Sequence, residues 1–311
     1  MPQETPLANA RYCVLPVAYD ATVTYKRGTR NGPQAIIDAS AEVELFDEEF
    51  KRPLDELKIH TCPAVGDNAE KPEKTVERVH DSVKSLLNNK ECFPLVLGGE
   101  HSISVGAVRA ALEKHSNLTV LYFDAHADLR NEFDGSAFNH ACAARRMLDD
   151  GCRLVQVGIR SLDEEQYDLI KKTAENKLKV FWARDFENED GSTHHALGAA
   201  TAFERKIGEI ASAVGSGPVW ISFDLDAFDP SEMPAVGTPE PGGLHWRDVL
   251  RILRGGCANA RVIGADVVEL CPQQGLHYAD FAAARLCVKI LAYKEFLGST
   301  GKTGGKARDK A

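Results

Sequence analysis

Short apolar runs rich in β-branched and aromatic residues recur along the chain, and longer stretches with helical spacing lie between them. Continuous apolar runs of this kind predict strands that are buried on both faces of a sheet. The predicted strands are Tyr12–Pro16, Pro94–Leu97, Thr119–Phe123, Leu154–Val157, Val180–Trp182, Val219–Phe223 and Val262–Val268. The predicted helices are Lys74–Asn89, Val105–His115, Thr201–Ala213, Trp246–Gly255 and Asp280–Glu295.

Alternating strands and helices indicate an α/β fold with a mainly parallel sheet that is covered by helices on both faces. In such folds, ligands bind outside the carboxyl ends of the strands. The pattern has no internal repeat and no linker, so we expect a single domain over residues 1–297. The Gly/Lys-rich residues 298–311 have nothing to bury and are expected to form a flexible tail.

Composition narrows the class of protein further. The 311 residues are 43% hydrophobic, enough for a large core, and the formal net charge is −9. The chain has no basic block, which argues against a nucleic-acid partner, and its acidity is mildly favourable to a cationic substrate. It also has no secretory signal and no apolar run long enough to span a membrane, and its eight scattered cysteines contain no CxxC pair. We therefore expect a cytoplasmic protein with reduced thiols.

Acidic and imidazole side chains directly follow four of the predicted strands. His101 follows the strand at Pro94–Leu97, and Glu269 follows the strand at Val262–Val268. The other two strands lead into Asp-x-His-x-Asp and Asp-x-Asp motifs, which comprise Asp124, His126, Asp128, Asp224 and Asp226. In an extended backbone, residues two apart point to the same side, so each motif can direct its side chains at one point.

Buried carboxylates are costly unless a positive charge compensates them, and a pair of divalent metal ions would do so. Four carboxylates and two imidazoles without a thiolate suit Mn²⁺ better than a structural zinc, although Mg²⁺, Fe²⁺, Co²⁺ and Ni²⁺ stay possible. Two such ions roughly 3.5–4 Å apart lower the pKa of a shared water toward neutrality. The sequence therefore predicts a binuclear metallohydrolase.

These motifs resemble those of the ureohydrolase family, which comprises arginases, agmatinases, guanidinobutyrases and formiminoglutamases. The resemblance rests on the segments 98–102, 124–128 and 222–230, with further matches at 28–33 and 237–243, and covers about Val14 to Tyr293. One departure is Glu100, which stands where the family more often has Asp.

The resemblance implies a three-layer α/β/α fold with a central eight-stranded parallel sheet, as in arginases and deacetylases, and a centre of two Mn²⁺ ions. One ion would take His101, Asp124, Asp128 and Asp224, and the other Asp124, His126, Asp224 and Asp226. Asp124 and Asp224 would then bridge the two ions.

The implied reaction is attack of hydroxide on a guanidinium carbon, which releases urea and an amine. Asp128 would accept the nucleophile's proton. His140 resembles the family histidine that lies near the metals without binding them, and would deliver a proton to an amine with a pKa near ~10. Glu269 matches the family acid that pairs with the substrate guanidinium.

The segment before and after His140 favours agmatine as the substrate. Phe138 stands where arginases carry an Asn that helps to hold the amino-acid end of arginine, and Arg145 and Arg146 match agmatinases. Arg130 keeps an acid such as 4-guanidinobutyrate open, so guanidinobutyrase, guanidinopropionase, arginase and formiminoglutamase remain alternatives.

Two other classes are less favoured by the sequence. A zinc deacetylase of the same fold would not need Asp128 and Asp226 beside His101, and it carries a His-His pair that is here found only at His194-His195, in a polar loop. A non-catalytic binding protein would be expected to have lost a ligand. By analogy with the family, we expect a homo-oligomer, either a trimer or a hexamer.

Overall fold

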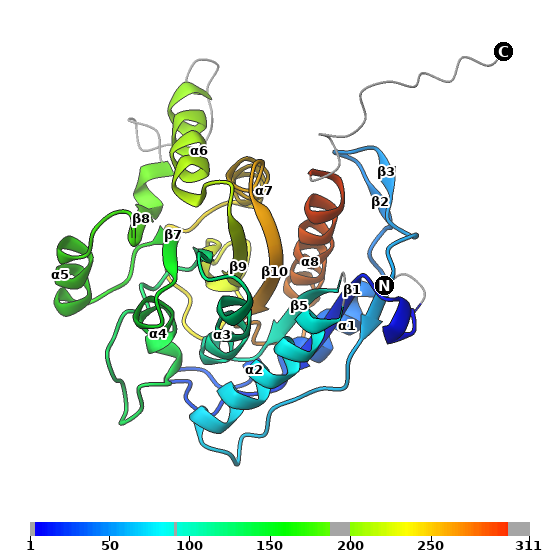
Figure 1. Cartoon of the computed structure of the whole chain (residues 1–311), viewed down its shortest axis with the longest axis horizontal. Helices are drawn as coiled ribbons and strands as arrows, with labels where there is room; N and C mark the ends of the chain where they lie inside the picture. Colours follow the sequence, from blue (N-terminus) through cyan, green and yellow to red (C-terminus); the bar gives the residue numbers. More distant parts are fainter. Residues whose placement is uncertain (1–3, 90–91, 187–199, 298–311) are drawn as a thin grey trace.

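The chain forms a three-layer α/β/α structure around one eight-stranded sheet (Figure 1). The computed structural model describes residues 4–89, 92–186 and 200–297. The strand order is β4-β1-β5-β10-β9-β6-β7-β8, and every neighbouring pair in this sheet is parallel. The expected fold class is therefore confirmed.

The strands of the main sheet are short, and all but the edge strands β4 and β8 are almost wholly buried. They are β1 (Tyr12–Val17), β4 (Ile59–Thr61), β5 (Phe93–Gly98), β6 (Thr119–Phe123), β7 (Arg153–Ile159), β8 (Leu178–Trp182), β9 (Pro218–Asp224) and β10 (Arg261–Val268). The helices are α1 (Gly32–Ser40), α2 (Pro72–Asn88), α3 (Ser104–Lys114), α4 (Ala143–Asp149), α5 (Glu164–Lys172), α6 (Ala200–Val214), α7 (Trp246–Gly256) and α8 (His277–Leu297). A separate antiparallel pair is made by β2 (Phe46–Asp47) and β3 (Arg52–Pro53).

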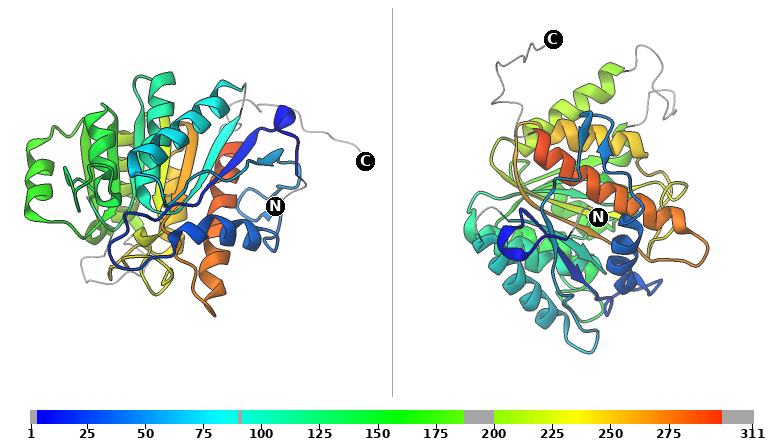
Figure 2. Two further views of the ribbon diagram at one scale, coloured as in Figure 1. Left: turned by 90° about the horizontal axis from the view of Figure 1, so that it is seen from below. Right: turned by 90° about the vertical axis from the view of Figure 1, so that its right-hand side faces the viewer.

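Helices cover both faces of the sheet, as its apolar strands require. On one face α2, α3 and α4 pack against the sheet, and on the other face α1, α6 and α8 do so, with α7 beside α6 and α8 (Figures 1 and 2). Two large hydrophobic clusters result, one on each side of the sheet. None of the helices in the described ranges is both long and apolar enough to cross a bilayer.

All seven predicted strands are present, with ends that differ from the predicted ones by at most two residues. The predicted ranges do not include β2, β3, β4, α1, α4 and α5, because these elements are short and, in α5, the helix carries charge on most of its surface. Residues 298–311, predicted to form a flexible tail, and His194-His195 lie outside the described residues. The single-domain assignment stays a prediction.

The strand order decides where the motifs meet. The four strands that precede them, β5, β10, β9 and β6, are consecutive neighbours at the centre of the sheet. Their parallel registers bring all four carboxyl ends to the same edge. Side chains separated by as many as 168 positions in the sequence therefore converge there.

Candidate metal centre

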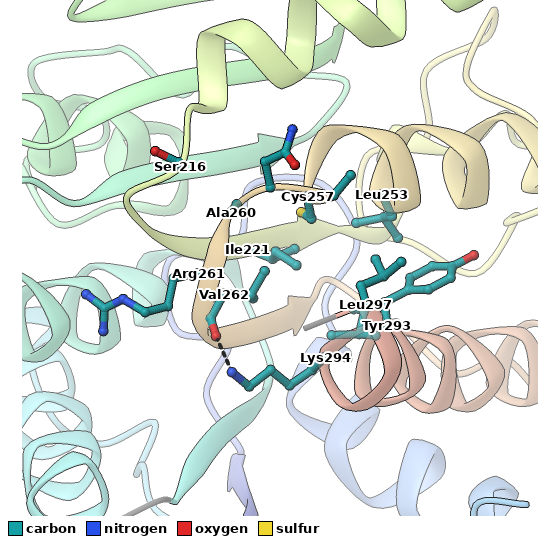
Figure 3. A pocket seen from close by; sticks show the side chains of 13 residues that line it. Ser216, Ile221, Leu253, Cys257, Ala260, Arg261, Val262, Tyr293, Lys294 and Leu297 are labelled. Atoms are coloured by element: carbon teal, nitrogen blue, oxygen red, sulfur yellow. Dashed lines mark hydrogen bonds between the residues drawn. The ribbon is translucent and has the colours of Figure 1, made fainter. Parts of the chain in front are cut away.

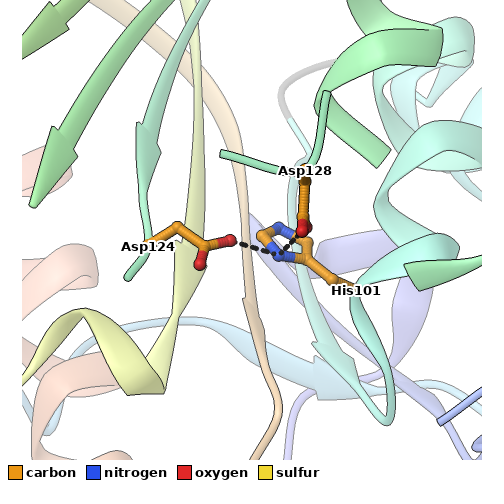
Figure 4. Close-up of side chains that lie close together, drawn as sticks. All are labelled: His101, Asp124 and Asp128. Carbon is orange, nitrogen blue, oxygen red and sulfur yellow. Dashed lines mark ion pairs between the residues drawn. The ribbon is translucent and has the colours of Figure 1, made fainter. Parts of the chain in front are cut away.

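His101 faces three carboxylates at the carboxyl edge of the sheet. Its Nδ1 atom lies 3.0 Å from Asp124 Oδ2, 3.2 Å from Asp224 Oδ2 and 3.5 Å from Asp128 Oδ2. Figure 4 shows Asp124 and Asp128, both from the segment after β6, pointing at the imidazole from two directions. His101 is fully buried, so these charges are shielded from solvent.

A second group lies on the other side of Asp124. His126 Nδ1 is 3.0 Å from Asp226 Oδ2 and 3.5 Å from Asp124 Oδ1. His101, Asp124 and Asp128 form one set that could hold a metal ion, and Asp124, His126 and Asp226 form another. Asp124 is common to both sets, which is the arrangement expected of a bridging ligand.

Local backbone turns hold the carboxylates in place. Asp124 Oδ1 accepts a hydrogen bond from the backbone N–H of His126 at 2.6 Å, and Asp224 Oδ1 accepts one from that of Asp226 at 2.8 Å. The chain then leaves its extended conformation at Asp128, which has a φ of 50°. This left-handed residue turns its carboxylate back toward His101, and such strain is most often found at functional sites.

Three further residues, Ser222, Asp266 and Tyr122, orient His101 and are not among the predicted site residues. The Nε2 atom of His101 lies 3.0 Å from Ser222 Oγ, and the Ser222 hydroxyl donates to Asp266 Oδ1 at 2.7 Å. The Tyr122 ring stacks on the imidazole with centroids 4.6 Å apart. These contacts direct Nδ1 toward the carboxylates, as partners of metal-binding histidines commonly do. Ser222 and Asp266 could have been found from the sequence, since each is a polar residue within an otherwise apolar predicted strand.

The charges in this cluster are strongly coupled. Burial raises the pKa of Asp128 to about 7, with the Asp124 carboxylate as the next cause. Burial opposes the charged form of His126, but Asp226 and Asp124 outweigh it and raise its pKa to about 12. The pKa of His101 is likewise raised by Asp124 and Asp224 against the effect of burial. In the absence of another cation, protons neutralise the acids of this site.

The cluster fits a pair of divalent cations. Asp124 Oδ2 is buried and accepts no hydrogen bond among the described residues, although it lies 3.0 Å from His101 Nδ1. A buried carboxylate oxygen that accepts no hydrogen bond is costly, and a metal ion bound at Oδ2 would remove that cost. The donor set, oxygen with imidazole nitrogen, is one that Mn²⁺ and its neighbours accept.

A cavity of about 260 Å³ opens beside the cluster. His126, Asp128 and His140 line it, together with Arg130 and Asp163 at its rim. Burial lowers the pKa of His140 to about 4, with the nearby His126 and His101 as further causes, so its imidazole is neutral at pH 7.

Arg130 already forms an ion pair with Asp163. Its Nη1 atom is 2.6 Å from Asp163 Oδ2, and its guanidinium lies 4.7 Å from the centroid of the Phe133 ring. Asp163 is itself held in place, because it accepts the backbone N–H of Gln166 as the N-cap of α5. Arg145 and Arg146 pair with Asp149 on α4, as expected of structural partners.

Glu269 does not line the cavity but lies behind the cluster. It is buried, has a φ of 68°, and accepts the backbone N–H of His101 at 2.7 Å through Oε1. Burial raises its pKa, and the neighbouring Glu100 adds to the shift. Its role as partner of the guanidinium stays a prediction.

A larger cavity, of about 360 Å³, lies at the opposite, amino edge of the sheet (Figure 3). Ile221, Val262 and Tyr293 line it, and Lys294 reaches across to the carbonyl of Val262. It contains neither of the two His/Asp sets, so the chemistry resides at the carboxyl edge.

Comparison with known proteins identifies the class. A family model described as the arginase family matches residues 10–292. The N(1)-aminopropylagmatine ureohydrolase of Synechocystis is 36% identical over 93% of this chain and 90% of its own. The agmatinase of Pyrococcus horikoshii is 30% identical over 92% of each chain. The crystal structure of agmatine ureohydrolase of Thermoplasma volcanium has a TM-score of 0.77 and 30% identity, and covers 94% of this chain and 92% of its own.

The chain therefore belongs to the arginase family. It is a ureohydrolase, that is, a hydrolase that acts on guanidino C–N bonds. The resemblance seen in the sequence motifs is thereby confirmed.

Proposed function

We propose that this protein hydrolyses the guanidino group of agmatine or its N1-aminopropyl derivative. The atoms and charges balance: guanidinium and water give urea and an alkylammonium ion. The second product would be putrescine from agmatine, or spermidine from the aminopropyl derivative. Both reactions belong to polyamine formation.

The six side chains at the carboxyl edge would hold two divalent ions, with Mn²⁺ as the favoured metal. One ion would take His101, Asp124, Asp128 and Asp224, and the other would take Asp124, His126, Asp224 and Asp226. The ions would supply a hydroxide nucleophile at neutral pH. The convergence of these side chains around Asp124 is the observation that carries the proposal.

The protein's own residues would manage the protons. Asp128 is hydrogen-bonded by the Tyr122 hydroxyl at 2.8 Å and lines the cavity, so it can accept a proton from the nucleophile. His140 is neutral at pH 7 and can therefore pass on a proton only after accepting one. It would deliver that proton to the departing amine.

The rim of the cavity favours a substrate with a cationic tail. Among the described residues that line the cavity, Arg130 is the one Arg or Lys, and Asp163 neutralises it. The carboxylate of 4-guanidinobutyrate would have to displace Asp163 to gain this cation. The names of the relatives support the same choice, since both contain agmatine or its derivative.

The test is urea release from Mn²⁺-loaded protein with agmatine, N1-aminopropylagmatine, arginine and 4-guanidinobutyrate supplied in parallel. We expect kcat/KM to be at least ~100-fold higher for one of the two amines than for either acid, because a buried, unpaired carboxylate costs several kcal/mol. Preference for an acid would overturn the substrate proposal but keep the chemistry. The absence of urea from all four would overturn the proposed reaction.

A further inference from the structure

We propose that Glu100 is a positioning residue that acts on His140 through Thr22. The inference rests on the proposed function, since it concerns the residue that would deliver the proton. Glu100 is the position where the chain departs from the commoner family motif, and it makes no contact with the cavity.

Glu100 is fully buried, and both of its carboxylate oxygens accept short hydrogen bonds. Oε2 accepts the backbone N–H of Thr22 at 2.6 Å, and Oε1 accepts the Thr22 hydroxyl at 2.5 Å. Oε1 also accepts the hydroxyl of Ser102 at 2.5 Å. The carboxylate thus accepts two hydrogen bonds from Thr22 but one from Ser102.

The loop that contains Thr22 is fixed to the Gly98-Gly-Glu segment by the backbone as well. The N–H of Glu100 donates to the carbonyl of Tyr19 at 2.8 Å. A Cβ on Gly99 would lie 1.9 Å from that same carbonyl oxygen, so only glycine permits the approach. The loop therefore has a defined position from which Thr22 can hold another segment.

Thr22 in turn holds the segment that carries His140. Its Oγ1 accepts the backbone N–H of His140 at 3.1 Å, and its carbonyl accepts the Asn139 side chain at 3.3 Å. On the same loop, Thr24 Oγ1 lies 3.3 Å from His140 Nε2. The Thr22 hydroxyl donates to Glu100 and accepts from His140, so it bridges the two directly.

The length of the side chain explains why Glu rather than Asp stands here. Asp is shorter by one methylene, roughly 1.5 Å, and could not reach both groups of Thr22 without moving the loop. A shift of about 1 Å in a proton-transfer group can cost ~100-fold in rate. Glu100 thus acts on turnover from a distance, through one hydroxyl.

The experiment compares Thr22→Val, Thr22→Ser, Glu100→Gln and Ser102→Ala in Mn²⁺-loaded protein. We expect Thr22→Val to lower kcat by ~10- to ~100-fold with KM within about twofold and metal content unchanged. Thr22→Ser keeps the hydroxyl and should restore kcat to within about threefold of wild type. Glu100→Gln should lower kcat as Thr22→Val does, because an amide N–H group would then face a hydrogen-bond donor of Thr22.

Ser102→Ala is the matched control, since it removes a bond of equal length to the same carboxylate oxygen without touching Thr22. It should keep kcat within about twofold. An equal loss of kcat in Ser102→Ala, or wild-type kcat in Thr22→Val, would overturn the inference.

Hydrogen exchange measured by mass spectrometry gives a readout that does not depend on turnover. In Thr22→Val, the peptide over residues 136–146 should exchange faster, while peptides from β6 and β9 should not change. Unchanged exchange in 136–146 would overturn the bridge between Thr22 and His140. If wild-type protein releases no urea, the proposed function fails on its own, and the exchange data still decide whether the bridge exists.

Discussion

At the scale of single residues, the site is a set of ionisable groups whose charges cannot be considered separately. Asp124 is shared by the two His/Asp sets, and its Oδ2 atom lacks a hydrogen bond among the described residues. His140 faces the same cavity but has a lowered pKa, so it stays neutral where His101 and His126 do not. In the metal-free protein two of these histidines are thus protonated and the third is neutral, for reasons of environment alone.

Asp226→Asn tests the second metal position. We expect the metal content to fall from two ions to one and turnover to fall by at least ~10³-fold, because the amide provides no charge opposite His126. Metal analysis of the dialysed protein and urea release measure the two effects. Two bound ions with full turnover would contradict the binuclear centre.

His140→Asn tests proton delivery. The metal content should not change, and kcat should fall by ~10²- to ~10⁴-fold, the usual contribution of a general acid. With a substrate whose leaving amine is more acidic, the fall in kcat caused by His140→Asn should be smaller. His115→Asn is a suitable control, since this surface histidine of α3's C-terminus lies outside the cavity lining. Wild-type kcat in His140→Asn would remove the assigned role.

At the scale of elements, the site depends on where strands end. The Asp-x-His-x-Asp motif begins directly after β6, and the Asp-x-Asp motif begins at the last residue of β9. The backbone does not stay extended as the spacing predicted, because Asp224 caps a 3-10 helix over Leu225–Ala227. In both motifs the first Asp instead accepts the backbone N–H of the residue two positions later, which keeps the paired side chains together. The helix α8 is not part of the site but binds the β2–β3 segment through an ion pair. Its buried Lys289 is paired with Asp47 at 2.9 Å and Glu48 at 2.8 Å, which fixes the β2–β3 segment on the helix.

Lys289→Met should destabilise the fold by ~3–5 kcal/mol, because it leaves the buried Asp47 carboxylate without its cation. The measurement is the free energy of unfolding in urea or guanidinium chloride. Lys294→Met on the same helix is the control, since Lys294 donates to the carbonyl of Val262 and the variant should cost only ~1 kcal/mol. Equal effects of the two variants would show that the buried ion pair has no special weight.

At the scale of the whole molecule, metal binding and folding are linked through protons. The raised pKa values of His101 and His126 mean that the metal-free protein holds protons on both at neutral pH. A metal ion must displace them, and raising the pH removes the competitor. Metal affinity should therefore rise with pH and fall as the site is acidified.

Calorimetric titration with Mn²⁺ at one pH, in buffers of different ionisation enthalpy, measures this proton release. We expect a positive release at pH 7 that becomes smaller in His126→Asn. Chelation should lower the unfolding temperature, since free metal at 100 times its Kd stabilises the folded state by about 2.7 kcal/mol. Binding without proton release would contradict the charge states assigned to the two histidines.

Much of the fold was predictable because buried parallel strands leave a local signature. The runs at Thr119–Phe123 and Val219–Phe223 were located almost to the residue. The strand β4 and the helices α1 and α5 were missed, because a three-residue edge strand and helices of nine residues are too short to show a clear hydrophobic period. Their formation depends on pairing with β1 and on packing against α8 and β8.

The sequence by itself determined the identity of the chemical groups and the strands that carry them, because spacing and strand ends are local properties. Only the tertiary structure decided that β5, β10, β9 and β6 are neighbours, which brings the acids within a few ångströms of one another. It also decided that Asp163 neutralises Arg130 and that Glu100 reaches His140 through Thr22. These contacts join segments far apart in the chain, and no local pattern encodes which distant partner a charged side chain will meet.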